Sequence, residues 1–205
     1  MDKQAELKKI EVEMAANKGL PLQESNLVFG EGDIDCKVIF IGEAPGVNED
    51  RLRRPFVGRG GQLLDNMIQG IGWKRADVYI TNIVKRRPPE NRDPLPEEIE
   101  AYKPYLTRQI AVIDPKLIVT LGRFSMNYFL PFAKITRDHG HPLLVDGRTI
   151  FPIYHPAAAL RSTQMMETLR EDFKKIPSVL SGEFGVVELP PAKPQPEKPK
   201  QTGLF

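Results

Sequence analysis

The stretch Val38-Ile-Phe-Ile-Gly-Glu-Ala-Pro-Gly46 decides the fold, because a short apolar run ends abruptly in a turn rich in glycine and proline. Runs of β-branched and aromatic residues of this length are typical of strands buried on both faces of a sheet. The same pattern recurs at residues 78–83, 117–121 and 149–154. The sequence therefore predicts four buried strands.

Longer amphipathic stretches separate these runs. Apolar residues recur at helical spacing over 62–72, 96–113 and 123–130, and Pro96 is a residue favoured in the first turn of a helix. Strands that alternate with helices require right-handed crossovers between parallel strands. We therefore expect an α/β fold with three αβα layers around a central, mostly parallel four-stranded sheet.

The remaining sequence predicts a division into three parts. Residues 1–26 form an N-terminal helical cap, residues 27–180 form one catalytic domain, and residues 181–205 form a proline-rich tail. After Val187, prolines alternate with lysine and glutamate, a composition that does not build a core and favours an extended, disordered linker. The cap is predicted from apolar residues at loose helical spacing, namely Leu7, Ile10, Val12 and Met14.

Composition sets broad limits on function. The chain has 29 Lys+Arg and 27 Asp+Glu in 205 residues, so affinity for nucleic acid must come from local patches. The single cysteine, Cys36, excludes an intramolecular disulfide and any site that needs several thiolates. No run approaches the roughly 20 apolar residues of a membrane span. We expect a soluble, cytoplasmic monomer without a membrane partner.

Polar side chains follow three of the four predicted strands. Glu43 comes after the first strand, Asn82 ends the second, and His155 follows the fourth. Because ligands bind at the carboxyl ends of parallel strands, a carboxylate, an amide and an imidazole would meet at one rim. Each signal alone has a structural alternative, a tight turn for residues 42–46 and a structural hydrogen bond for His155. Their occurrence at a common rim favours a functional site.

Two basic loops adjoin that rim. The loop at residues 51–61 carries four arginines suited to phosphate and Phe56 suited to stacking on a base. Its alternative interpretation is a solvated glycine-rich loop with one buried phenylalanine. A second basic loop, at residues 85–92, begins directly after the second strand.

Four motifs together resemble the family-four uracil-DNA glycosylases, the thermostable bacterial and archaeal type. They are GEAPG at 42–46, RPFVGRGGQLL at 54–64, VYITNIVKRRPPENRDP at 78–94 and HPAAALR at 155–161, in matching order and spacing between Leu27 and Ile176. The resemblance implies a uracil-DNA glycosylase fold and a DNA-repair hydrolase of base excision repair. Such an enzyme flips uracil out of DNA and cleaves its N-glycosidic bond, which leaves an abasic site.

The resemblance also implies roles at the base. Phe56 would stack on uracil, Asn82 would pair with its N3–H and O4, and Glu49 would line the side that carries the methyl group in thymine. His155 would donate a hydrogen bond to O2, where negative charge develops, helped by a backbone N–H of the 42–46 turn. Glu43 would either position the attacking water or stabilise the sugar cation by its charge. The implied catalytic residues are Glu43 and His155, and the implied uracil-binding residues are Gly42, Glu49, Phe56, Asn82 and His155.

Further residues are implied to contact DNA. Leu160 would fill the gap left by the flipped base, although a helix core position is an equal alternative, and Arg161 and Ser162 would hold phosphate. The full implied DNA-binding set is Arg54, Arg59, Lys85, Arg86, Leu160, Arg161 and Ser162.

The sequence departs from the family at its metal cofactor. Family members hold a four-iron, four-sulfur cluster on four cysteines, and the corresponding positions here fall near Ala15 and Lys18 and on Arg86 and Tyr102. One thiol cannot bind such a cluster, so we expect no cofactor and no metal. Residues 85–94 also lack the histidine with which a related branch forms a covalent bond to DNA.

The C-terminal sequence resembles the pentapeptide that binds the bacterial replication sliding clamp. Gln201, Leu204 and Phe205 match its pattern, whereas Thr202 stands where leucine is usual, and the alternative is an unstructured end. Two other functions remain open: a reader of deaminated bases that does not cleave, and a glycosylase that prefers hypoxanthine or xanthine. A flavin- or nucleotide-binding protein is disfavoured because the chain has neither GxGxxG nor a P-loop.

Overall fold

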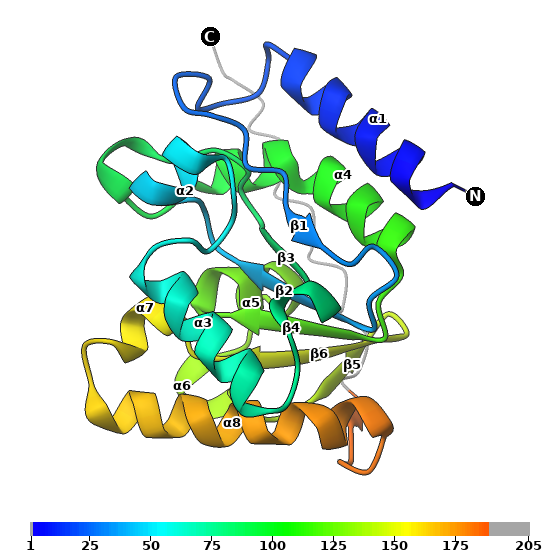
Figure 1. Ribbon diagram of the computed structural model, residues 1–205, viewed down its shortest axis with the longest axis vertical. Helices are drawn as coiled ribbons and strands as arrows, with labels where there is room; N and C mark the ends of the chain where they lie inside the picture. The colour runs from blue at the N-terminus through cyan, green and yellow to red at the C-terminus, as the bar shows by residue number, and fades with distance from the viewer. Residues whose placement is uncertain (1, 189–205) are drawn as a thin grey trace, which may run out of the picture.

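The computed structural model describes residues 2–188. A seven-stranded sheet with strand order β1-β3-β2-β4-β6-β5-β7 forms its centre (Figure 1). The strands are β1 (Glu31–Gly32), β2 (Val38–Gly42), β3 (Tyr79–Asn82), β4 (Leu117–Leu121), β5 (Leu143–Val145), β6 (Arg148–Ile153) and β7 (Val187–Glu188).

The four predicted strands form the middle of this sheet. β3, β2, β4 and β6 are consecutive neighbours and all run parallel. The predicted strand number was too low, because β1 and β5 add antiparallel neighbours at the two sides and β7 then pairs with β5. These added strands are two or three residues long, too short to produce a recognisable apolar run.

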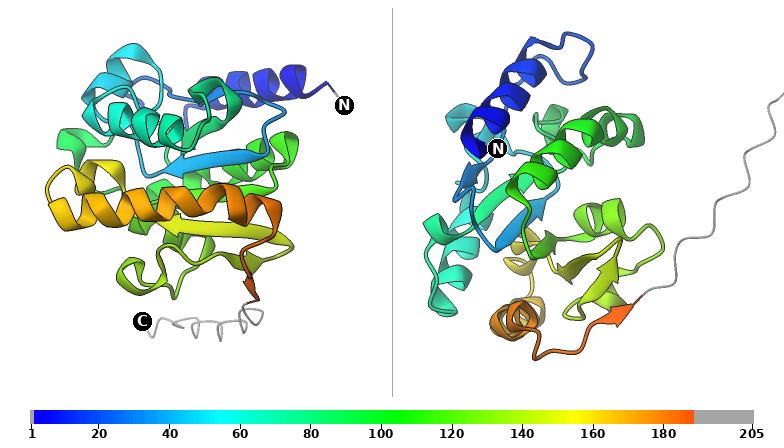
Figure 2. Two further views of the ribbon diagram at one scale, coloured as in Figure 1. Left: turned by 60° about the horizontal axis from the view of Figure 1, so that its bottom comes forward. Right: turned by 90° about the vertical axis from the view of Figure 1, so that its right-hand side faces the viewer.

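The helices cover both faces of the sheet, as the three-layer prediction requires. The longer ones are α1 (Lys3–Ala16), α3 (Arg59–Gly70), α4 (Pro96–Ile113) and α8 (Thr163–Ser181). The shorter ones are α2 (Val47–Leu52), α5 (Arg123–Phe129), α6 (Ile135–Asp138) and α7 (Pro156–Ala159), with 3-10 turns at Arg75–Asp77 and Pro89–Asn91. In the left view of Figure 2, α3 and α8 lie in front of the strands.

Two apolar clusters, one on each face, hold the layers together. Val38 and Phe40 of β2 pack with α3 and α8, whereas Ile39 and Ile41 pack with α1, α4 and α5. Successive strand residues point to opposite faces, so a strand buried on both sides is apolar throughout. α1 contributes Leu7, Ile10 and Met14 to the second cluster. The division into cap, domain and tail remains a prediction.

The parallel strands bring their carboxyl ends to one side of the molecule. In Figure 1 these ends point to the left, where α2, α7 and the start of α3 lie. Glu43, Asn82 and His155 stand at the exits of β2, β3 and β6, and Gly122 follows β4. Within residues 2–188, no helix combines the length and apolar character needed to cross a membrane.

Candidate active site

The exits of β2 and β3 stay paired beyond the sheet. Gly42 lies opposite Asn82 in the ladder. The N–H of Ile83 then donates to Gly42 O at 3.0 Å, and the N–H of Val84 donates to Glu43 O at 3.0 Å. These bonds fix Glu43 and Asn82 next to each other, as the sequence predicted for a shared rim.

Gly42 brings Phe56 and Asn82 together. A Cβ atom at Gly42 would lie 2.5 Å from Asn82 Oδ1 and would overlap the Phe56 ring, so only glycine allows this approach. The Phe56 ring is buried and lies 5.6 Å from the His155 ring, with 30° between the two planes. Phe56 and Asn82 therefore meet at Gly42, and His155 lies beside Phe56.

Asn82 presents an unused hydrogen-bond acceptor. The residue is 1% exposed, and its Oδ1 atom has no hydrogen-bond partner within the part of the chain that the structure describes. A buried polar atom left in this way costs about 1–3 kcal/mol, and native proteins contain few of them. An N–H donor of a planar ligand lying against Phe56 would satisfy it.

Glu49 of α2 holds the loop that carries Phe56. Its Oε1 atom accepts hydrogen bonds from the backbone N–H groups of Val57, at 2.9 Å, and Gly58, at 2.8 Å. The carboxylate thus fixes Phe56 through the backbone that follows it. This positioning contact adds to the base-lining role that the resemblance implies.

His155 is held as a neutral ring with a defined tautomer. Its Nδ1 atom accepts a hydrogen bond from the N–H of Ala157 at 3.1 Å, so the ring proton belongs on Nε2. Burial lowers the pKa of His155 to about 4, and the Glu49 carboxylate opposes this shift. At neutral pH the imidazole therefore offers an Nε2–H donor, as the resemblance implies for the contact with O2.

Glu43 is also only partly exposed. Burial and, to a smaller extent, the Asp93 carboxylate raise the pKa of Glu43 to about 7, and the positive charge of Arg123 opposes this shift. A carboxyl group with this pKa changes its charge near neutral pH, as general bases in active sites do. The rim thus combines a titratable carboxylate, a neutral imidazole donor, an unpaired amide oxygen and an aromatic face.

Several predicted DNA contacts lie exposed on the same side. Leu160 ends α7 with 39% exposure, so its alternative role as a core residue has no support. Arg161 and Ser162 are exposed and line a shallow hollow of about 380 Å³ with Arg170. Arg59 is exposed at the start of α3. The remaining exposed member, Arg54, pairs with Glu31 at 2.7 Å.

Lys85 and Arg86 were wrongly predicted to contact DNA. Lys85 is 0% exposed, and its Nζ atom donates to Phe29 O, Thr81 Oγ1 and Gln109 Oε1. Burial holds the pKa of Lys85 well below its usual value. The error has a structural reason, because the backbone bends after Asn82 and residues 83–86 turn into the protein. Arg86 is 7% exposed, and its guanidinium donates to Ser25 O.

The positions that correspond to cluster ligands offer no thiolate. Ala15 and Lys18 are exposed, whereas Arg86 and Tyr102 are buried, and the Tyr102 hydroxyl donates to Pro21 O at 2.8 Å. Cys36 is buried elsewhere in the core, and burial raises its pKa to about 11. Between residues 2 and 188, no three His, Cys, Asp or Glu side chains are grouped to hold a metal ion. These side chains do not fit an iron–sulfur cluster.

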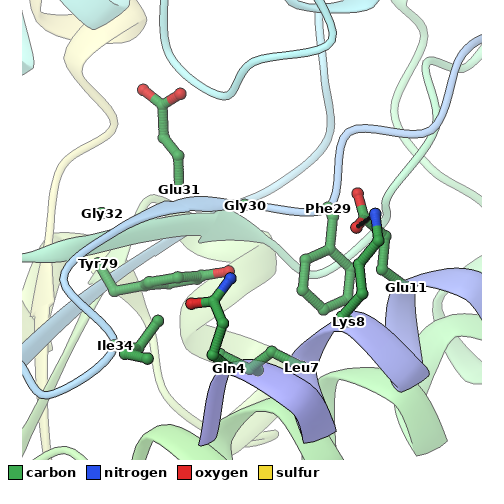
Figure 3. Close-up of a pocket in the computed structure, with 10 residues that line it drawn as sticks. All are labelled: Gln4, Leu7, Lys8, Glu11, Phe29, Gly30, Glu31, Gly32, Ile34 and Tyr79. Carbon is green, nitrogen blue, oxygen red and sulfur yellow. Dashed lines mark hydrogen bonds and ion pairs between the residues drawn. The ribbon is translucent and has the colours of Figure 1, made fainter.

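A cavity of about 230 Å³ lies between α1 and β1, apart from the rim. Figure 3 shows the rings of Phe29 and Tyr79 on its sheet side and Leu7 on α1. None of the predicted site residues lines it. The cavity is therefore a feature of the contact between α1 and the sheet, and it is separate from the site at the strand ends.

An aromatic ring, a buried amide and a neutral imidazole thus lie close together at the strand ends of this α/β protein. The chain belongs to the uracil DNA glycosylase superfamily, whose family model matches residues 29–177.

Within this superfamily, the chain is similar to type-4 uracil-DNA glycosylases. The chain is 47% identical over 182 residues to a type-4 uracil-DNA glycosylase of Sulfurisphaera tokodaii, with 83% of each chain covered. It is 41% identical over 169 residues to a type-4 uracil-DNA glycosylase of Thermotoga maritima, with 80% of this chain and 88% of the relative covered. It is 46% identical over 162 residues to the type-4 enzyme of Archaeoglobus fulgidus, with 75% and 81% covered.

Proposed function

We propose that this chain removes uracil from DNA by hydrolysing the bond between the base and deoxyribose, which leaves an abasic site for base excision repair. The observation that carries the proposal is the buried, unpaired Asn82 Oδ1 beside the face of Phe56. The family membership and the type-4 relatives support the same activity.

Recognition of uracil would rest on Asn82. Uracil presents a donor at N3 and an acceptor at O4, which match the oxygen and the NH₂ group of an amide, whereas cytosine presents the opposite pattern. Two mismatched buried groups, at about 1–3 kcal/mol each, would reject cytosine strongly. Phe56 would supply the stacking surface and Gly42 the space beneath it.

Cleavage would use His155 and Glu43 in different steps. As the bond breaks, negative charge moves onto uracil O2 and positive charge onto the sugar. The Nδ1 atom of His155 already accepts from Ala157, so the neutral ring carries its proton on Nε2. This Nε2–H would donate to O2 with no change of tautomer. Glu43, in its carboxylate form, would orient the water that attacks the sugar, and its charge would also favour the cationic sugar.

The DNA strand would be held by exposed residues around this pocket. Leu160 would enter the space left by the flipped base, while Arg59, Arg161 and Ser162 would contact phosphate. Ser162 caps α8 by accepting from Met165 N–H at 3.3 Å, so a phosphate there would also meet the positive end of a helix.

The test of the activity is a single-turnover assay with a large excess of enzyme over an oligonucleotide that carries one uracil. We expect an alkali-labile site at the uracil and none in the matched oligonucleotide with thymine. Absence of any alkali-labile site under these conditions would reject hydrolysis and leave a reader that does not cleave.

We also propose that the chain works without an iron–sulfur cluster. The support is the donor set, since a methyl group, an ammonium, a guanidinium and a phenol stand where thiolates would be needed. Arg86 and Tyr102 fill part of the region with side chains bonded to Ser25 O and Pro21 O. Elemental analysis of the active, purified protein is expected to find no stoichiometric iron or acid-labile sulfide, and four irons per chain would refute the proposal.

A third proposal concerns Gln201, Leu204 and Phe205, which lie outside the described residues. Their sequence supports binding to a replication sliding clamp, where a glutamine and two apolar side chains fit a groove. Deletion of residues 201–205 is expected to abolish affinity for the clamp of the same organism and to leave uracil excision unchanged. Equal affinity of the full and shortened chains would refute this proposal.

A further inference from the structure

An ion pair joins the segment after β3 to the first residue of α5, next to the exit of β2. Arg123 Nη2 lies 2.6 Å from Asp93 Oδ2. Asp93 belongs to the segment between β3 and α4, and Arg123 is the first residue of α5 after β4. β2 lies between β3 and β4 in the sheet, and Ile41 of β2 pairs with Thr120 of β4, so Arg123 starts beside the end of β2. Glu43 is the residue that follows β2 there.

We propose that Asp93 and Arg123 act as positioning residues, forming a strap beside Glu43 that sets the electrostatic surroundings in which its carboxylate works. This inference rests on the proposed function of Glu43. It adds two residues that contact neither the base nor the reacting sugar in that scheme, and that act through the charge of Glu43.

The Arg123 end of the strap is fixed by its surroundings. The N–H of Gly122 donates to Ile153 O at 2.8 Å, which joins the exits of β4 and β6. A Cβ at Gly122, where φ is +90°, would lie 2.9 Å from His155 Cβ, so Arg123 starts next to the imidazole. Its guanidinium carbon lies 4.3 Å from the centroid of the Phe124 ring. The Phe124 ring thus supports the Arg123 guanidinium on one side.

The Asp93 end is fixed by the residue before it. Arg92 donates to Asp93 O at 3.0 Å and forms two hydrogen bonds with Glu98 of α4, at 2.9 and 2.6 Å. Glu98 also accepts from the N–H of Leu95 at 2.8 Å. The backbone around Asp93 is thereby tied to the start of α4, and the Asp93 carboxylate is held where Arg123 reaches it.

The two ends of the strap act on Glu43 with opposite sign. Asp93 raises the pKa of Glu43, and Arg123 lowers it. The other charged or titratable groups on the facing elements are already engaged: Glu49 of α2 binds two backbone N–H groups, and His155 after β6 is neutral at pH 7. Lys85, beyond β3, is buried among its own acceptors. Asp93 and Arg123 therefore form the ion pair whose charges act on Glu43.

We expect substitutions in the strap to leave the fold intact. Both side chains are about three-fifths exposed, 61% for Arg123 and 62% for Asp93. Exposed ion pairs contribute little to folding stability. Arg148 and Asp114 form a matched control pair, at 3.2 Å, with Arg148 of β6 and Asp114 directly after α4.

The experiment measures the single-turnover excision rate against pH for the full chain and for the variants Asp93→Asn and Arg123→Gln. We expect the rising limb to move to lower pH in Asp93→Asn and to higher pH in Arg123→Gln. Each shift should be about 0.5 pH unit, a size typical of an exposed unit charge within about 10 Å. The double variant should return near the wild-type midpoint, and Arg148→Gln and Asp114→Asn should not move it.

A purely structural role predicts a different pattern, because breaking one bond from either end should change the rate in the same direction. Unmoved midpoints, or shifts of the same sign in both variants, would overturn the strap. The Glu43→Gln variant distinguishes failure of the strap from failure of the proposed role of Glu43. If it is inactive while the strap variants keep the wild-type midpoint, only the strap fails. If it keeps the wild-type rate and pH profile, the role of Glu43 and the strap both fail.

Discussion

Replacing Glu43 with glutamine should stabilise the protein, and the gain should grow with pH. Burial raises the pKa of Glu43 from 4.5 to about 7. The folded state therefore holds this proton more tightly than the unfolded state does. Below pH 4.5 the carboxyl is neutral in both states and carries no penalty. As pH rises from 4.5 to 7, the unfolded state gains its charge first, and wild-type stability falls.

The size of this effect follows from the pKa difference. Each unit corresponds to 1.36 kcal/mol, so the full shift corresponds to about 3 kcal/mol above pH 7. Glu43 is partly exposed, and solvent screening reduces the figure, so we expect about 1–2 kcal/mol. Glutamine keeps the shape and removes the charge, and it should recover this amount at pH 8 and almost none at pH 4.5.

The assay is urea unfolding of both chains at pH 4.5, 6 and 8, followed by tryptophan fluorescence or circular dichroism. Glu171→Gln serves as a matched control, because Glu171 is an exposed glutamate in α8 whose partner is Lys174. The difference in unfolding free energy between Glu43→Gln and the wild type should change with pH. A constant difference, or a loss of stability at pH 8, would refute the claim that the folded state disfavours the charged form of Glu43.

Three further substitutions test separate parts of the molecule. Lys85→Met should lower the free energy of unfolding by about 2–4 kcal/mol, because buried acceptors lose their donor. The salt dependence of its DNA binding should stay unchanged, and a shallower slope would restore Lys85 as a phosphate contact. Leu160→Ala should change stability by less than about 0.5 kcal/mol, yet slow excision from duplex DNA more than from single strands; equal slowing on both substrates would contradict a wedge. Gly42→Ala should reduce excision roughly 100-fold, since its Cβ displaces Phe56 or Asn82. Wild-type activity in that variant would contradict the tight approach on which the pocket depends.

The centre of the fold was predictable because burial on both faces leaves a strong pattern. The apolar runs gave the four parallel strands, and the predicted helix over 96–113 agrees with α4. The edge strands escaped prediction, although the turn between β5 and β6 carries a signal. Asp146 and Gly147 both have positive φ there, as an Asp-Gly hairpin turn requires.

The rim was predictable in its members and less so in its contacts. Topology alone brings Glu43, Asn82 and His155 together, whereas the sequence around Lys85 and Arg86 is basic and gave no sign that both side chains turn inward. Arg123 was also overlooked, although it stands at the exit of the third predicted strand, because its role depends on Asp93 thirty residues earlier in the chain.

The most direct test of the account compares the release of free bases by the wild-type chain and by Asn82→Asp under single-turnover conditions. Oligonucleotides that differ only in one uracil or one cytosine provide matched substrates. We expect the wild-type chain to release uracil and no cytosine. Asn82→Asp should lose most of the uracil release and gain measurable cytosine release. Unchanged discrimination in a folded Asn82→Asp protein would contradict the claim that this amide reads the edge of the base.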